Sequence, residues 1–225
     1  MVTKSIGCPV LTETYGTVTP MPPPTDRPAE YHADLNLALR GYVGTTAYLG
    51  LVDYIGLVDP NAPQLPGLFV DNRTATFRKN YQVYGWDWTC NCRTTPITDW
   101  QVTLSGLLVT QTETIRLPRS GYDIGKLPNG YSAMVLYAST NRITFTYTRN
   151  DNVKAGYALH LENICVEPRL LALYQSTNAA GRTQLPALYA GQGIGTAIGN
   201  ELGVAIRDTG SFMDPRSRKD WWQGR

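Results

Sequence analysis

The second half of the chain is dominated by short segments in which apolar and polar residues alternate, with glycine and turn residues between them. Four of these segments span residues 131–138, 142–149, 156–166 and 202–206. Successive side chains of a β-strand point to opposite faces of a sheet, so a period of two predicts strands. Closely spaced strands that are separated by turn residues predict a mainly β protein.

The first half of the chain has weaker patterns. Residues 34–42 alternate and predict a strand, whereas residues 47–59 are apolar but broken by glycine and predict a buried strand or a short irregular hairpin. Residues 80–92 are rich in aromatic residues and predict a strand with a bulge near Gly85. Residues 100–110 predict a further strand.

One segment favours a helix instead. Pro168 can occupy a first helical position, where its missing N–H is not needed, and Leu170 and Tyr174 fit one helical face. Gly181 can end the helix. We therefore expect one short helix over residues 168–180 in a protein that is otherwise mainly β.

The composition favours an extracellular protein over a nucleic-acid-binding or membrane-spanning one. Charged residues make up 17% of the chain, below the usual value of about 25%. The formal net charge of +2 gives no strong attraction to nucleic acid or to an anionic membrane. No apolar run approaches the roughly 18 residues of a membrane span. No export signal is visible, so the protein either is cytosolic or has lost a leader, and the composition favours an extracellular or cell-envelope location.

The chain divides into three predicted parts. Its 225 residues allow one large all-β domain or two small ones. Residues 17–28 are rich in proline and predict an extended linker. We therefore expect a proline-rich N-terminal arm at residues 1–30, a β-rich domain at residues 31–112, and a second β domain with a basic and aromatic tail at residues 113–225.

The four cysteines, Cys8, Cys90, Cys92 and Cys165, allow three disulfide connectivities. Cys90 and Cys92 are two residues apart, and a pair at this spacing bonds to itself only with strain. We therefore expect one of them to pair with Cys165 or with Cys8. A zinc site would need a matching second pair, which the sequence lacks, so structural disulfides are favoured over free thiols and over a metal site.

Most catalytic motifs are missing from the sequence. It has no phosphate-binding loop and no nucleophile elbow, and its one glycine-rich run precedes a strand rather than a helix. His32 and His160 are the only histidines, so a histidine-rich zinc site cannot form. His160 lies in an alternating strand, where a hydrogen-bonded sheet residue fits as well as a ligand. We predict neither a cofactor nor a metal.

Several short motifs follow one another in a fixed order between residues 113 and 216. They consist of Gly121, Asp123 and Ile124, then Gly191, Gln192, Ile194 and Gly195, and finally Leu202, Arg207, Gly210, Asp214 and Pro215. This order resembles the "H-x-G-x-D-I", "G-Q-x-I-G", "H-L-H-F-E-x-R" and "G-x-x-x-D-P" phrases of the LytM/M23 family of peptidoglycan peptidases. The resemblance implies a LytM-like β-sheet domain of the duplicated hybrid motif type.

The zinc-binding histidines of the family are missing at the matching positions. Arg119 and Gly203 stand at two histidine ligands, and only the aspartate ligand is retained, as Asp123. Glu201 and Ser176 replace two further histidines. A catalytic zinc needs three protein ligands and one open position, so the resemblance implies a domain without peptidase activity. We expect Arg119 and Asp123 to form an ion pair in place of the metal.

Degenerate members of this family keep the groove and use it to bind cell-wall material or proteins. The resemblance therefore implies a non-catalytic, secreted cell-envelope protein that binds peptidoglycan or another glycan, or a cell-envelope protein. The candidate groove residues are Arg119, Asp123, Ser176, Glu201 and Arg207.

Four tryptophans, Trp86, Trp88, Trp221 and Trp222, are candidate aromatic binding residues. Close tryptophans can form a platform on which sugar rings stack, and basic residues beside the last two can add cation–aromatic contacts. Packing against the protein's own core is the commoner role, and we favour it for both pairs.

Two other functions stay open on the sequence alone. An active cell-wall hydrolase could hold its metal through unexpected ligands such as His160, Asp123 and Glu201. A secreted structural or carbohydrate-binding β module could use the four tryptophans.

Overall fold

The computed structural model describes residues 8–125 and 130–224, and it is mainly β, as the alternating segments predicted. The strands of the first half are β1 (Gly16–Val18), β2 (Tyr42–Thr45), β3 (Phe77–Asp87), β4 (Cys92–Pro96), β5 (Leu104–Leu108) and β6 (Thr114–Arg116). Those of the second half are β7 (Ala133–Ser139), β8 (Arg142–Thr146), β9 (Tyr157–Glu162), β10 (Ile164–Val166), β11 (Leu185–Leu188), β12 (Gly193–Ala197), β13 (Glu201–Asp208) and β14 (Ser211–Met213). The helices are α1 (Leu37–Arg40), α2 (Pro168–Ala179) and α3 (Arg218–Trp221), with short 3₁₀ turns η1 (Ala29–Tyr31) and η2 (Leu65–Leu68).

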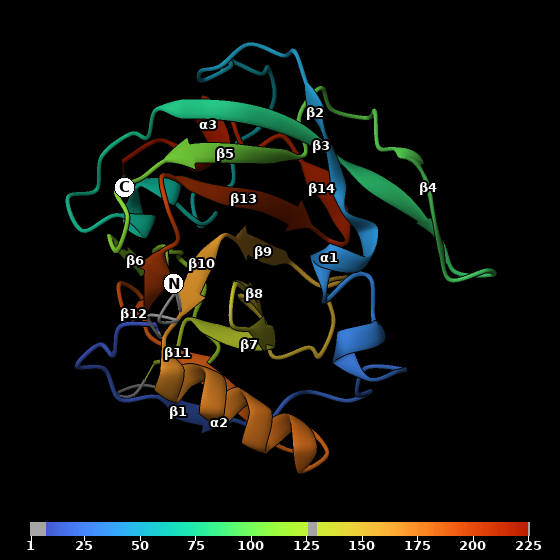
Figure 1. Cartoon of the computed structure of the whole chain (residues 1–225), viewed down its shortest axis with the longest axis vertical. Coiled ribbons are helices and arrows are strands. Elements are labelled where there is room, and N and C mark those ends of the chain that lie inside the picture. Colours follow the sequence, from blue (N-terminus) through green and yellow to red (C-terminus); the bar gives the residue numbers. More distant parts are fainter. Residues whose placement is uncertain (1–7, 126–129, 225) are drawn as a thin grey trace, which may run out of the picture.

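Most strands belong to one large sheet, which runs across the whole molecule (Figure 1). Its strand order is β1-β11-β7-β8-β9-β13-β5-β3-β2, with β14 paired to β13 and β4 paired to β3. A second sheet of order β10-β12-β6 is smaller. Neighbouring strands in both sheets are antiparallel.

The main core combines buried side chains from both sheets with others from helix α2 and from the C-terminal segment. On β13, Leu202, Val204 and Ile206 are fully buried in this core, as their alternation predicted. The opposite face of the same strand is also covered, since Ala205 and Arg207 are buried there. Because β13 pairs with β5 on one side and β9 on the other, it is a central strand that has both faces inside the protein.

Helix α2 begins at Pro168 and lies against β7 and β11, where the sequence predicted the one short helix. The Glu167 carboxylate caps it by accepting hydrogen bonds from the N–H groups of Arg169 and Leu170, which have no partner within the helix. Leu170 and Tyr174 are the buried residues of its inner face.

The large sheet crosses the predicted domain boundary at residue 112. Strands β2, β3 and β5 come from residues 31–112, yet β5 pairs with β13 from residues 113–225. The proline-rich arm joins the sheet as well, because β1 pairs with β11 and Met21 forms a bridge with Asn150. The start of that arm, residues 1–7, lies outside the described residues.

The strand predicted over residues 34–42 is wrong. Asn36 caps a short helix, α1, by accepting a hydrogen bond from the N–H of Ala38, and Gly41 ends the helix with a φ of 65°. The polar residues of the alternation are not turned to solvent, since Asp34, Asn36 and Arg40 are all buried. The Asn36 side chain caps the helix, and Asp34 and Arg40 form an ion pair, so these buried polar groups have partners. The alternation of polar and apolar residues is therefore present although the segment is not a strand.

Residues 47–59 form an irregular loop with no strand pair of its own, so neither the buried strand nor the short irregular hairpin that the sequence left open forms there. The loop meets the C-terminal segment at one parallel bridge, between Val52 and Ser217. Its large apolar residues Tyr48, Leu49, Ile55 and Leu57 are exposed.

The disulfides join Cys8 to Cys165 and Cys90 to Cys92. The expectation that the close pair would not bond to itself is therefore wrong. Cys90 and Cys92 lie at the turn between β3 and β4, where Asn91 adopts a φ of 51°. This turn brings their Cα atoms to 5.3 Å, within the range that a disulfide spans.

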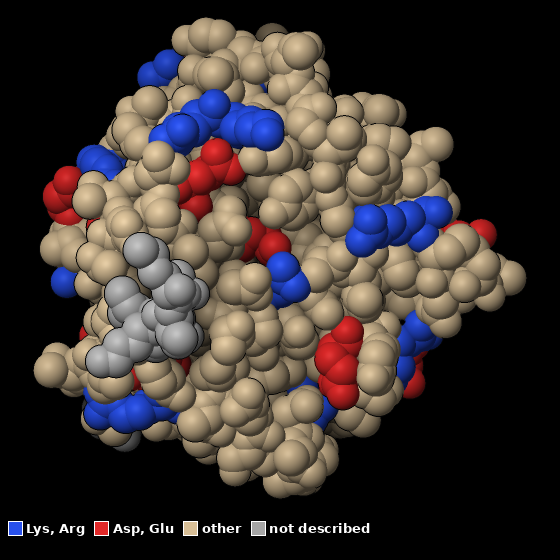
Figure 2. Space-filling model, in the orientation of Figure 1, with Lys and Arg blue, Asp and Glu red and all other residues tan. Residues whose placement is uncertain are grey.

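Charged side chains do not gather into a patch of one sign on the face drawn in Figure 2. Lysine, arginine, aspartate and glutamate form small separate groups between broad uncharged areas. Within the described residues no helix combines the length and the apolar character needed to cross a membrane.

Candidate functional site: an aromatic cleft

A cleft of about 450 Å³ lies beside helix α3. One wall is the rim loop, which we define as residues 54–59, and Trp100 lies next to it. The other wall comes from the start of β9, the end of β13, β14 and α3. Ligand sites are typically concave and largely apolar, with a few converging polar groups, and this cleft combines all three properties.

Residues 214–218 hold the segment around Val52, which leads into the rim loop, in place. The N–H of Val52 donates to the carbonyl of Arg216, and the N–H of Arg218 donates to the carbonyl of Val52. Arg216 forms a fully buried ion pair with Asp214 at 2.7 Å, and the Tyr54 hydroxyl donates to the same carboxylate at 2.8 Å. Burial and this hydrogen bond raise the pKa of Tyr54 to about 12, so its phenol stays a neutral donor.

Aromatic rings line both sides of the cleft. Tyr54 and Trp100 meet edge to face with ring centroids 4.9 Å apart, and Tyr157 meets Trp221 in the same manner at 5.6 Å. The Trp221 indole N–H donates to the carbonyl of Asp214, which orients its ring. Such rings give apolar surfaces with partly negative faces, suited to C–H groups and to cations.

A carboxylate is held at the inner end of the rim loop. Asp59 begins a turn with Pro60, and its Oδ1 accepts a hydrogen bond from the N–H of Asn61. Its Oδ2 accepts hydrogen bonds from the hydroxyls of Tyr122 at 2.7 Å and Tyr157 at 3.1 Å. Burial, with the negative charges of Asp208 and Asp59, raises the pKa of Tyr157 above its ordinary value, so this phenol also remains a donor.

The charged groups that line the cleft are mainly acidic. Asp59, Asp208 and Asp220 contribute three carboxylates and Lys219 one ammonium, a formal charge of −2. Lys219 is already engaged, because its Nζ lies 2.7 Å from Asp220 and donates to the carbonyl of Leu57. The cleft therefore favours a ligand that carries hydroxyl or amino donors over an anion.

Ile55 and Leu57 form an apolar rim outside the aromatic rings. Their relative exposures are 104% and 98%, the highest of the exposed large hydrophobic residues. Gly56 between them has a φ of 132°, which side-chain-bearing residues rarely adopt, so the loop presents both side chains outward. Neighbouring exposed aliphatic side chains are typical of a binding surface.

A larger depression of about 590 Å³ near β5 and β6 is less suited to binding. Its lining contains no aromatic residue. Its arginine, Arg73, is already shared between Asp71 at 3.0 Å and Glu113 at 2.6 Å.

The groove residues predicted from the sequence do not form one site. Arg119 forms a backbone bridge with Gln64, whereas Ser176 lies on α2. The Asp123 carboxylate accepts a hydrogen bond from the N–H of Gly125, and the Glu201 carboxylate accepts one from the Tyr81 hydroxyl at 2.6 Å. Among the described residues no hydrogen bond or ion pair connects one of these four residues to another. The ion pair expected between Arg119 and Asp123 is therefore not formed.

The residues at the positions that match the zinc ligands of the LytM family do not fit a zinc ion. Gly203 packs against Glu162, and a Cβ atom added there would lie 3.0 Å from the Glu162 Cβ, so a larger side chain would fit only if Glu162 shifted. Within residues 8–125 and 130–224 no three His, Cys, Asp or Glu side chains come together as a possible metal site. The ligand set of the alternative hydrolase, His160, Asp123 and Glu201, is therefore not assembled.

Arg207, the fifth predicted groove residue, lies inside the protein. Asp34 Oδ1 accepts hydrogen bonds from Arg207 at 2.8 Å and from Arg40 at 2.7 Å. The Arg207 guanidinium also lies 4.3 Å from the centroid of the Phe212 ring. We call Asp34, Arg40 and Arg207 the buried ionic cluster. Arg207 does not face a groove, because β13 is a central strand and a buried guanidinium on it has to be neutralised by an internal carboxylate.

His160 lies beside this cluster and is buried. Thr144 Oγ1 donates its proton to the carbonyl of Leu35, so His160 Nδ1, 2.9 Å away, carries a proton and donates to Thr144. Burial lowers the pKa of His160 well below its ordinary value, and the nearby arginine Arg207 acts in the same direction. His160 is therefore a neutral sheet residue.

The four predicted tryptophans fall into two environments. Trp221 and Trp222 are buried, and their indole N–H groups donate to the carbonyls of Asp214 and Pro215, so neither offers an open platform. Trp221 nevertheless contributes to the floor of the cleft. Trp86 and Trp88 lie on the β3–β4 hairpin, with ring centroids 6.3 Å apart.

Sequence reasoning missed most of the cleft. Tyr54, Trp100 and Tyr157 are far apart in the chain and belong to no motif, so only the fold brings them together. The apolar residues of the 47–59 segment were visible in the sequence, but the two structures expected for it, a buried strand or a short irregular hairpin, did not predict an exposed rim. No family model, no curated protein and no solved structure matches this chain. The LytM resemblance stays a prediction.

Proposed function

We propose that the protein is a secreted, non-catalytic cell-envelope module that binds peptidoglycan in the aromatic cleft. The observation that carries this proposal is the combination of aromatic walls, carboxylates and a formal charge of −2 in one concave site. The two disulfides are consistent with an extracellular location. The LytM resemblance of residues 113–216, which lacks the family's histidines, supports binding without hydrolysis.

The chemistry of peptidoglycan suits such a cleft. Its sugar rings present C–H faces that pack on aromatic rings such as those of Trp100 and Tyr54. Its hydroxyl groups and the amino groups of its peptides are donors, for which Asp59 and Asp208 provide carboxylate acceptors. The cleft also takes one wall, including Tyr157 and Asp208, from the segment that resembles the peptidases.

Binding to insoluble peptidoglycan tests the proposal directly. Purified protein is mixed with increasing amounts of sacculi, and the fraction left in solution gives the apparent Kd. Replacing Trp100 by alanine is expected to weaken binding about tenfold, because tryptophan is enriched among the residues that dominate binding energy and a loss of about 1.4 kcal/mol is a factor of ten. Trp88→Ala is the matched control, since Trp88 is a partly exposed tryptophan on a different element. Each variant is checked for an unchanged melting temperature.

Two outcomes contradict the proposal. If the unmodified protein does not bind sacculi, or if Trp100→Ala and Trp88→Ala bind as well as the unmodified protein does, the cleft is not a peptidoglycan site. A further variant, Ile55→Ser with Leu57→Ser, tests the alternative of a protein ligand. If that double change abolishes capture of a cell-envelope protein while sacculi are not bound, the rim is a protein-binding surface instead.

A further inference from the structure

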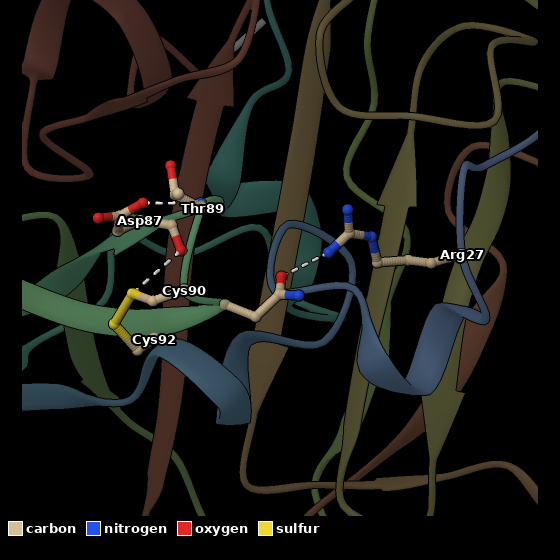
Figure 3. Close-up of a disulfide and its surroundings, with 6 residues drawn as sticks. Arg27, Asp87, Thr89, Cys90 and Cys92 are labelled. Carbon is tan, nitrogen blue, oxygen red and sulfur yellow. Dashed lines mark hydrogen bonds between the residues drawn. A yellow bond between two sulfur atoms is a disulfide. The ribbon is translucent and has the colours of Figure 1, made fainter.

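The β3–β4 hairpin extends beyond the body of the sheet and carries the Cys90–Cys92 disulfide at its tip (Figure 1). Both cysteines are exposed, and β4 is exposed along most of its length. Figure 3 shows the bridge between Cys90 and Cys92, with Asp87 and Thr89 beside it, and Arg27 of the N-terminal arm hydrogen-bonded to the Asn91 side chain at the same turn. A thiol of another molecule can therefore reach these sulfur atoms without unfolding of the hairpin.

This bridge adds little to the fold. A disulfide restricts the unfolded chain more when it closes a longer loop, and this one encloses only Asn91. Cys8–Cys165, in contrast, joins residues 157 positions apart. The hairpin has its own supports, because Arg93 donates to the carbonyls of Leu39 at 2.7 Å and Ala38 at 3.0 Å. The structural role that explains Cys8–Cys165 therefore does not explain the second bridge.

The surroundings of the bridge distinguish its two sulfur atoms. Cys90 Sγ lies 3.8 Å from the carbonyl oxygen of Asp87, which disfavours a thiolate there but can accept a hydrogen bond from a thiol. Arg27 donates to the Asn91 side chain at 2.6 Å, although Asp26 shares its charge at 3.0 Å. This hydrogen bond ties the turn residue Asn91 to the N-terminal arm.

We propose that Cys90 and Cys92 form a redox-active disulfide that oxidises a dithiol of a partner protein. A thiolate of the partner attacks Cys90 Sγ, the Cys90–Cys92 bond breaks, and the Cys92 thiolate leaves and takes up one proton. The second partner thiolate then attacks the partner's sulfur in the mixed disulfide and releases Cys90, which takes up the second proton. The partner loses two electrons and gains a disulfide, while the bridge becomes two thiols.

The released Cys90 thiol has a built-in acceptor. Its S–H can donate to the Asp87 carbonyl, which stabilises the reduced hairpin after the exchange. The proposed reaction uses none of the cleft residues, so it stands or falls independently of peptidoglycan binding.

A single-turnover assay tests the exchange. Full-length protein is mixed without oxygen with a synthetic peptide that contains two reduced cysteines. We expect about one peptide disulfide per protein molecule and none in the Cys90→Ser/Cys92→Ser variant. A peptide with a single reduced cysteine, mixed with the unmodified protein, is expected to attach to Cys90 by exchange with the bridge and to leave Cys92 as a thiol, as mass spectrometry of the digested complex shows. Circular dichroism and the melting temperature check that the double variant is folded.

Selective reduction provides the second measurement. In a graded series of reduced to oxidised dithiothreitol, Cys90–Cys92 is expected to open at a ratio about tenfold lower than Cys8–Cys165 does. The proposal is overturned if both bridges open at the same ratio, or if the double variant still oxidises the peptide. It is also overturned if the peptide stays reduced with the unmodified protein.

Discussion

Replacing Asp34 by asparagine is expected to destabilise the protein by about 3–5 kcal/mol, because it removes the only negative charge of the buried ionic cluster. The side chains of Arg40 and Arg207 are 7% and 6% exposed, and both guanidinium groups donate to the same oxygen, Asp34 Oδ1. An amide at residue 34 can still accept hydrogen bonds, but it cannot balance two buried positive charges. The predicted loss of unfolding free energy arises because the two guanidinium charges would stay buried without a balancing negative charge.

Acid provides an independent estimate of the same interaction. Burial alone would raise the pKa of Asp34, but Arg207 and Arg40 outweigh burial and lower the pKa from 3.8 to about 2. A carboxyl whose folded pKa is lowered stabilises the protein above its unfolded pKa and loses this contribution as the pH falls through the folded pKa. At about 1.4 kcal/mol per pKa unit, the loss is roughly 2 kcal/mol between about pH 4 and pH 2.

The assay is urea-induced unfolding, followed by tryptophan fluorescence at pH 7 and in a series down to pH 2. Asp53→Asn is the matched control, because Asp53 also pairs with an arginine, Arg218, but its side chain is 76% exposed. Its change should stay within about 0.5 kcal/mol. The reasoning is refuted if Asp34→Asn costs no more than Asp53→Asn at pH 7, or if the variant loses stability in acid as steeply as the unmodified protein does.

Two further predictions concern the interior of the large sheet. Gly203→Ala is expected to lower the free energy of unfolding in urea by about 1–3 kcal/mol, because the added Cβ would lie 3.0 Å from the Glu162 Cβ. Gly44→Ala is the control and should lower it less, because its Cβ would meet only Lys79 at 3.5 Å. Equal effects of the two substitutions would contradict this account. Burial lowers the pKa of His160, so the unfolded state binds the proton first and stability falls as the pH drops below about 6.5. His160→Gln should flatten part of that slope in a pH series of unfolding midpoints, while His32, whose pKa burial also lowers, retains its share; an unchanged slope would exclude His160 as a contributor.

The regular part of the fold could be predicted because local patterns and tertiary packing agree there. On β13 the alternation of Leu202, Val204 and Ile206 matches the face that enters the core, and Pro168 with Leu170 and Tyr174 marks helix α2. Residues 34–42 show where such reasoning fails. An alternating pattern says which side chains differ in polarity, but not whether the polar ones meet solvent or an internal ion pair.

The candidate site could not be predicted in the same way. Its aromatic rings come from the rim loop, the segment before β5, the start of β9 and helix α3, which have no common spacing in the sequence. The predicted groove residues Arg119, Asp123, Ser176 and Glu201 were chosen from the order of short motifs. Order along a chain does not fix distance in space: Arg119 and Asp123 lie in the loop between β6 and β7, whereas Ser176 lies on α2 and Glu201 on β13.

The sequence by itself determined a mainly β protein with one short helix at residues 168–180, since the period of two and a proline at a helix start are local properties of the backbone. It also excluded a histidine-rich metal site, because the chain has only two histidines. Only the tertiary structure decided which cysteines pair, that Arg207 neutralises Asp34, and that Tyr54, Trp100 and Tyr157 line one cleft. These outcomes depend on contacts between distant segments, and such contacts form only when the sheet as a whole brings the segments together.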